Sequence, residues 1–136
     1  MKRIILDLPD GLRDTLCDYV EQLNESMPFA QLGIGDIVRE TLDREYASIM
    51  ERPTPTYRIM DDLWARENHL GHINNTEFGW CYDTVLSIID EMISMIKPHI
   101  TVVLSILLHG SRNQHTFSID KVTTLESGKL LLELSS

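Results

Sequence analysis

The chain has 136 residues, of which 43% are hydrophobic, and its formal net charge is −9 at pH 7. This length accommodates one ordinary domain or two small ones, and the apolar content is enough for a packed core. Because the net charge is negative, the chain as a whole repels nucleic acid, and any DNA-binding surface has to concentrate its basic residues locally.

The first expected element is a short strand from Arg3 to Leu8. Its side chains alternate between an apolar face and a mixed face, which consist of Ile4, Leu6 and Leu8, and of Arg3, Ile5 and Asp7. A single short strand leaves a row of unpaired backbone donors and acceptors. We therefore expect a second copy of the chain to supply the pairing strand, in an obligate homodimer with the apolar face at its interface.

Two amphipathic helices are expected after Pro9, which suits the first turn of a helix. Their apolar positions recur at helical spacing: Leu12, Leu16, Tyr19, Val20 and Leu23, and then Ile34, Ile37, Val38, Leu42 and Tyr46. The intervening segment, residues 24–33, contains a proline and predicts a loop.

The run Gly35-Asp36-Ile37-Val38-Arg39-Glu40-Thr41-Leu42, the strand ending in Leu8-Pro9 and the amphipathic first helix together resemble the ribbon-helix-helix (MetJ/Arc-like) family. The resemblance covers residues 2–48 and implies a dimeric DNA-binding domain whose two-stranded ribbon enters the major groove. It implies base reading by Arg3, Ile5 and Asp7. It also implies phosphate contacts by Lys2 and by the start of the second helix, at Gly33, Ile34 and Gly35.

The sequence departs from this family in its charge. The first 52 residues carry six basic and eleven acidic side chains, and phosphates repel Asp7. The loop between the two helices is also longer than the family's tight turn. Two hypotheses therefore stand: a repressor-like regulator of transcription that binds double-stranded DNA, or an acidic protein-interaction module, antitoxin-like or inhibitory, that uses the fold only to dimerise.

A boundary between domains is expected at residues 53–56, where two prolines two residues apart cannot continue a helix. A short helix is expected over 57–70 and a long one from about 76 to 97. The long helix carries apolar residues in steps of four and three, a heptad-like spacing that suits a helix–helix interface: Phe78, Tyr82, Val85, Ile89, Met92 and Ile96. Such an interface pairs dimers into a tetramer or holds another protein, and the alternative is a core position for these residues.

The last part of the chain predicts three antiparallel strands, over 100–106, 116–125 and 129–134, the last after a Ser-Gly turn. A helix over residues 98–108 is the competing interpretation. The fold class is accordingly α+β: a ribbon-helix-helix domain (1–52), a linker (53–56) and a small α+β domain (57–136) with one long helix and about three strands.

Sequence motifs of catalytic, cofactor-binding or metal-binding sites are scarce. The carboxylates lie on helix faces expected to be solvated, and neither a phosphate-binding glycine loop nor a nucleophile elbow occurs, so we expect no enzyme and no cofactor. His69 and His72 are the best metal candidates, but the histidines and cysteines are too scattered for a metal to be expected. Cys17 and Cys81 give no disulfide framework and each lies in a stretch that predicts a core residue. The absence of a signal peptide or of an apolar run that spans a bilayer indicates a cytoplasmic protein without membrane contact.

Overall fold

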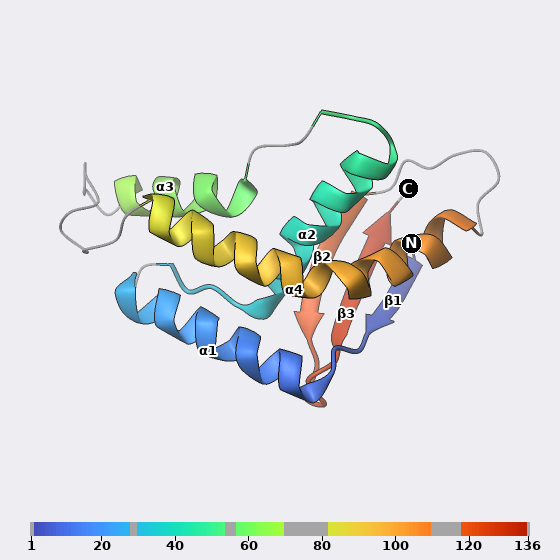
Figure 1. The fold of residues 1–136 in the computed structure, drawn as a ribbon, viewed down its shortest axis with the longest axis horizontal. Coiled ribbons are helices and arrows are strands. Elements are labelled where there is room, and N and C mark those ends of the chain that lie inside the picture. The colour runs from blue at the N-terminus through green and yellow to red at the C-terminus, as the bar shows by residue number, and fades with distance from the viewer. Residues whose placement is uncertain (1, 28–29, 54–56, 70–81, 110–117, 136) are drawn as a thin grey trace.

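The computed structural model describes residues 2–27, 30–53, 57–69, 82–109 and 118–135 (Figure 1). Its elements in chain order are β1 (Lys2–Leu6), α1 (Asp10–Ser26), α2 (Ile34–Ile49), α3 (Arg58–His69), α4 (Tyr82–His109), β2 (Ser118–Thr124) and β3 (Leu130–Ser135). The fold class is α+β, with the three strands in one antiparallel sheet of order β1-β3-β2.

Strand β1 pairs with β3 of the same chain. The register places Arg3 opposite Glu133, Ile4 opposite Leu132 and Leu6 opposite Leu130. The expectation that only a second copy could supply a partner for this strand is therefore wrong. The alternating leucines of β3 present the same period-two apolar face as β1, and antiparallel pairing brings the two faces together.

Strands β2 and β3 form a hairpin around the predicted Ser-Gly turn. Gly128 has a φ of +87°, a conformation that glycine adopts without the penalty of a Cβ. The turn is closed by a hydrogen bond of 2.8 Å from the Leu125 N–H to the Lys129 carbonyl. An irregularity in the pairing between Ile119 and Lys121 shifts the register of β2.

Helices α1 and α2 follow the predicted pattern. The first begins after Pro9, whose carbonyl accepts the Arg13 N–H at 2.9 Å, and it buries Leu16, Val20 and Leu23. The loop to α2 is fastened by the Asn24 side chain, which donates to the Leu32 carbonyl and accepts the Leu32 N–H. Cys17 is exposed on α1, so the expectation of a core cysteine is wrong at this position, and Cys81 lies outside the described residues.

Helix α4 continues through Pro98 to His109, so the strand expected over 100–106 is wrong and the helical alternative is correct. A proline inside a helix costs about 3 kcal/mol relative to alanine. Pro98 lies on the exposed side of the helix, while Ile96, Ile100 and Leu104, four residues apart, are fully buried. Burial of these side chains offsets the cost of the proline and overrides the strand propensity of the β-branched residues.

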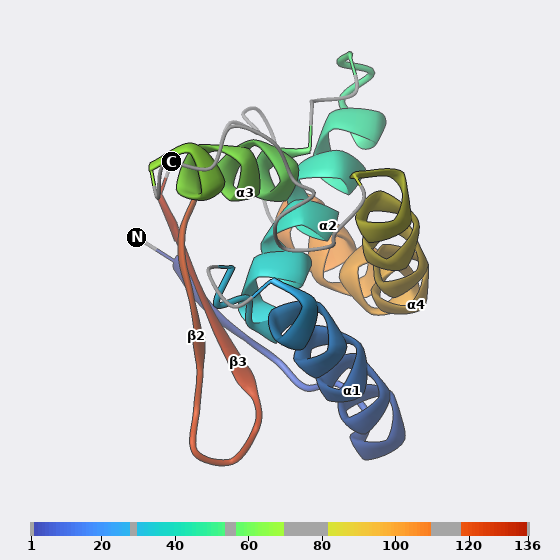
Figure 2. The same ribbon diagram turned by 90° about the vertical axis from the view of Figure 1, so that its left-hand side faces the viewer.

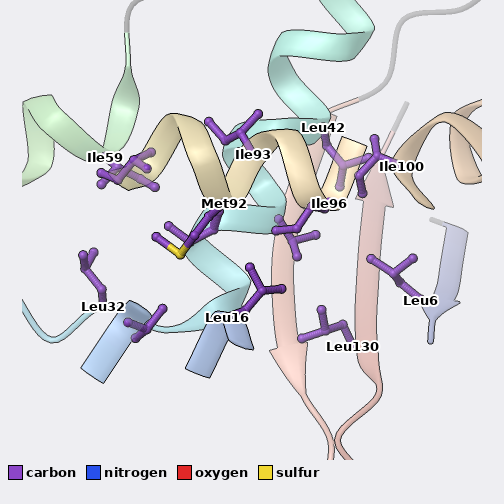
Figure 3. Packing of buried hydrophobic residues seen from close by; sticks show 14 of the residues in the cluster. Leu6, Leu16, Leu32, Leu42, Ile59, Met92, Ile93, Ile96, Ile100 and Leu130 are labelled. Atoms are coloured by element: carbon purple, nitrogen blue, oxygen red, sulfur yellow. The ribbon is translucent and has the colours of Figure 1, made fainter. Parts of the chain in front are cut away.

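Helices α1, α2 and α4 lie on one side of the sheet (Figure 2). Their buried side chains form one hydrophobic cluster with the inner face of the strands, in which Leu6 and Leu130 from the sheet meet Leu16, Leu42, Ile96 and Ile100 from the helices (Figure 3). This cluster takes residues from both sides of the predicted boundary at 53–56, so segments 1–52 and 57–136 share one core. None of the described helices is long and apolar enough to cross a membrane.

Candidate functional site

The outer face of the sheet carries the side chains expected to point away from the core. Arg3, Ile5 and Asp7 are exposed, Ile5 to 49%, whereas Leu6 and Leu8 on the other face are buried. The predicted alternation of β1 is therefore confirmed. Among the described elements, α1, α2 and α4 lie over the inner face, and the exposed side chains of the outer face are available to a partner.

Rows of residues across the strands give the outer face a mixed charge. Arg3 lies opposite Glu133, and Glu133 lies opposite Lys121, so the first row alternates in sign. The next row is largely apolar and joins Ile5, Leu131 and Thr123.

Beyond these rows, the Lys129 ammonium lies 3.9 Å from the Asp7 carboxylate. The face is thus a pattern of paired opposite charges around an apolar row, and not a uniformly positive surface.

The two outer strands of the sheet each have one edge without a strand beside it. Among the described elements, β1 pairs only with β3, and β2 also pairs only with β3. Helix α2 packs on the inner face of β2, where a Cβ built on Gly35 would lie 3.3 Å from a methyl carbon of Val122. We take the free edge of β1 as the candidate site for pairing with another chain, because its outward side chains are exposed.

The start of α2, where the family resemblance implies a phosphate contact, is already occupied by a carboxylate. The Gly33 N–H donates to Oδ2 of Asp36 at 2.9 Å, which caps the helix with the chain's own negative charge. Gly35 faces Val122 and allows the close packing of α2 on β2. These glycines, together with Ile34, have capping and packing roles in this structure, and the Lys2 side chain is not among those described.

The residues predicted for an oligomer interface lie mostly in the core. Leu6, Leu8, Val85, Ile89, Met92 and Ile96 are exposed to 4% or less, and Ile4 packs against the same cluster. Their heptad-like spacing thus reflects a helix buried within its own chain, which is the alternative interpretation of the pattern. Phe78 lies outside the described residues, as does the Tyr82 side chain.

A second site, which the sequence did not predict, surrounds a buried carboxylate on α2. Glu40 is only 2% exposed, and its Oε1 atom has no hydrogen-bond partner among the described residues. The carboxylate accepts the backbone N–H groups of Ile59 and Arg58, which open α3.

Charges around Glu40 come from several elements. Burial raises the pKa of Glu40 to about 7, against the lowering effect of the Ile59 N–H; Asp43 raises it further and Arg44 lowers it. Burial also raises the pKa of Asp43, which Arg39 and Arg58 oppose. One weak feature of the sequence indicates this site: Glu40 follows the apolar Ile37 by three residues, a spacing that places both on the inward side of α2.

A cavity of about 360 Å³ adjoins Glu40 between α2 and the start of α3. Its polar lining comes from Glu40, Asp43, Arg52 and Arg58, and its remaining lining from Tyr46, Ala47 and Pro53. The Arg52 guanidinium carbon lies 5.4 Å from the centre of the Tyr46 ring, within the range of a cation–π contact. The cavity therefore presents two carboxyl groups, two guanidinium groups and an apolar wall.

Metal ligands do not gather in the part of the chain that the structure describes, where no three histidine, cysteine, aspartate or glutamate side chains lie close enough to share an ion. The His69 side chain and all of His72 lie outside the described residues. Comparison with known proteins gives no relative: no family model, no curated protein and no solved structure matches this chain.

Proposed function

We propose that this protein is a homodimeric protein-interaction module whose sheet continues into that of a second copy through the free edge of β1. The observation that carries the proposal is the self-complementary outer face of residues 3–7, which comprise most of β1 and Asp7 directly after it. Read along the chain, Arg3, Ile5 and Asp7 give a positive, an apolar and a negative position, and an antiparallel copy presents the same three in reverse.

The register of such a pairing follows from the side-chain pattern. The inner face of each sheet is covered by its own helices, so an antiparallel pair of copies has to place inner residues opposite inner residues. The two-fold axis therefore passes through a residue and not between two. An axis at Ile5 places Arg3 opposite Asp7 of the second copy and pairs the two Ile5 side chains. An axis at Ile4 instead places Arg3 opposite Ile5 of the second copy and leaves both charges unmatched.

The register centred on Ile5 also extends the charge pattern within one chain. Arg3 already faces Glu133 and Asp7 lies near Lys129, so signs alternate across the joined sheets. Opposite charges and apolar residues in directly opposed positions contribute roughly 0.2–1 kcal/mol per pair. A five-residue strand offers few such pairs, and the dimer should therefore dissociate on dilution.

DNA binding is the second candidate function, since Arg3 and Ile5 are exposed on the face that a ribbon reader uses. Two features disfavour it. The joined sheet of two copies spans five strand spacings, about 24 Å, whereas the major groove is about 12 Å wide and admits a two-stranded ribbon. The outer face also carries Glu133 and Asp7 among its basic residues, and the net charge is −9.

Sedimentation velocity over about 1 to about 100 µM protein tests the dimer. The wild-type chain should shift from monomer to dimer across this range. Ile5→Lys should remain monomeric, because it sets two ammonium groups against each other at the two-fold axis. Ile49→Lys is the matched control, since Ile49 is exposed to 47% on α2, away from the sheet, and this variant should dimerise like the wild type.

A wild-type chain that is monomeric throughout, or an Ile5→Lys variant that dimerises normally, would overturn the proposal. Selection of duplexes from a randomised pool at low salt separates the second candidate. Enrichment of one DNA sequence, lost with Arg3→Ala, would establish the DNA-binding regulator instead.

A further inference from the structure

The cavity beside Glu40 has the features of a small-ligand site and is separate from the sheet edge. Its volume of about 360 Å³ falls at the small end of the range for ligand pockets. The first turn of α3 lies beside α2 at this point (Figure 1), so the cavity sits where two helices meet. Helix junctions are common positions for such sites.

The carboxylate of Glu40 gives the reason to expect a ligand in this cavity. An unpaired, buried oxygen of a carboxylate is costly, because water no longer solvates it and no donor replaces that water. Oε1 of Glu40 is such an atom within the described structure, and Glu40 lines the cavity. A ligand that brings an N–H donor to this atom would remove the cost.

The rest of the lining restricts the ligand further. Asp43 stands one turn from Glu40 on α2 and adds a second acceptor on the same side. Arg52 and Arg58 bring two guanidinium groups, which bind carboxylates through paired N–H donors. Tyr46, Ala47 and Pro53 supply apolar surface. Both signs of charge therefore face one small volume.

We propose that this cavity binds a small zwitterion of the α-amino-acid class with an aliphatic side chain. Its ammonium group lies toward Glu40 and Asp43, its carboxylate toward Arg52 and Arg58, and its side chain against the apolar wall. Because Glu40 also accepts the opening amides of α3, the bound molecule would act on the carboxylate that joins α2 to α3. This inference does not depend on the proposed dimer.

Isothermal titration calorimetry with L-leucine tests the proposal, together with two probes that each lack one charge. Leucinamide keeps the ammonium group without the carboxylate, and 4-methylpentanoate keeps the carboxylate without the ammonium group. L-Leucine should bind, and each of the two probes should bind at least about tenfold more weakly, the effect of losing a hydrogen bond to a charged group.

Variants of the two ends of the site complete the test. Arg52 is exposed, so Arg52→Ala should stay folded and should weaken L-leucine binding at least about tenfold. Glu40→Gln should weaken it similarly. Arg13→Ala is the matched control, because Arg13 lies on α1 and does not line the cavity, so this variant should leave leucine binding unchanged.

Proton release gives a second readout. The ionisable groups that face Glu40 are Asp43 and Arg44 from α2, Arg58 from α3, and Tyr57, which is hydrogen-bonded to Asp90 of α4. An ammonium group beside Glu40 favours its charged form, so binding at pH 7 should release protons in the wild type and none from this site in Glu40→Gln. The absence of heat with L-leucine, equal binding of all three compounds, or full binding by Arg52→Ala would each overturn the assignment.

Discussion

Removing the titration of Glu40 should change how the stability of the protein depends on pH. The perturbation is Glu40→Gln, which keeps the shape and an oxygen acceptor for the N–H groups of Arg58 and Ile59 but cannot ionise. Burial raises the pKa of Glu40 from 4.5 to about 7 in the folded protein. Between these two values the folded state holds a proton that the unfolded state has released.

The sign and size of the effect follow from this difference. Stability contributed by protonated Glu40 is fully present below the unfolded pKa, falls as pH rises, and is lost above the folded pKa. One unit of pKa corresponds to about 1.4 kcal/mol, so the wild type should lose on the order of 3 kcal/mol through this group between about pH 4.5 and about pH 8. Glu40→Gln should not show this loss.

Urea denaturation of both proteins across this pH range measures the effect. The free energy of unfolding of Glu40→Gln minus that of the wild type should rise with pH, and any constant offset from the amide does not alter the slope. Asp43 is present in both proteins, so its pH-dependent contribution to the free energy of unfolding cancels to first order in the difference. Glu51→Gln is the control, because it makes the same substitution at an exposed side chain just after the end of α2. A difference that stays level with pH would refute the reasoning about the buried carboxylate.

Three substitutions, one of them with a comparison variant, test the packing directly. Met92→Glu should unfold the protein, with loss of the far-ultraviolet circular dichroism, because Met92 is fully buried and a charge there has no partner; a folded variant with altered assembly would instead place this side chain at an interface. Gly128→Ala should lower the free energy of unfolding by about 1 kcal/mol, since the turn has a φ of +87°, and an unchanged urea midpoint would contradict that. Gly35→Val should cost roughly 1–3 kcal/mol through its clash with Val122, whereas Gly33→Ala has room and should cost less; equal thermal midpoints for the two variants would argue against close packing of α2 on β2.

The sequence predicted which face of each element is buried far better than it predicted which elements meet. The alternation of β1 and the stripe of α1 depend on neighbouring residues and were read correctly. The partner of β1 was missed, because β3 lies at the other end of the described chain and a local pattern carries no information on long-range pairing. The prediction that the helix ends before Pro98 was wrong for a related reason. Only the packing of α4 on the core shows that the helix can continue through this proline.

The candidate site on α2 was missed on similar grounds. A glutamate in an amphipathic helix normally lies in solvent, and the start of α3 covers Glu40 only in the folded chain. The phosphate contacts implied at Gly33 and Gly35 followed from residue type and position in a motif. In the structure Asp36 caps Gly33, and Gly35 contacts Val122, contacts that depend on a side chain three residues away and on a strand far along the chain. The phosphate contacts themselves stay a prediction.

The pairing of β1 with β3 also affects how the protein is made. During synthesis β1 leaves the ribosome first and its partner strand last among the described elements, so both edges of β1 stay open while four helices are added. Pairings between distant segments form slowly, and open strand edges invite association with other chains. Strand β1 is thus also the segment through which two nascent copies of this chain can exchange partners. Its short length, its charged Arg3 and the Asp7 that follows it limit that exchange to a copy in matching register.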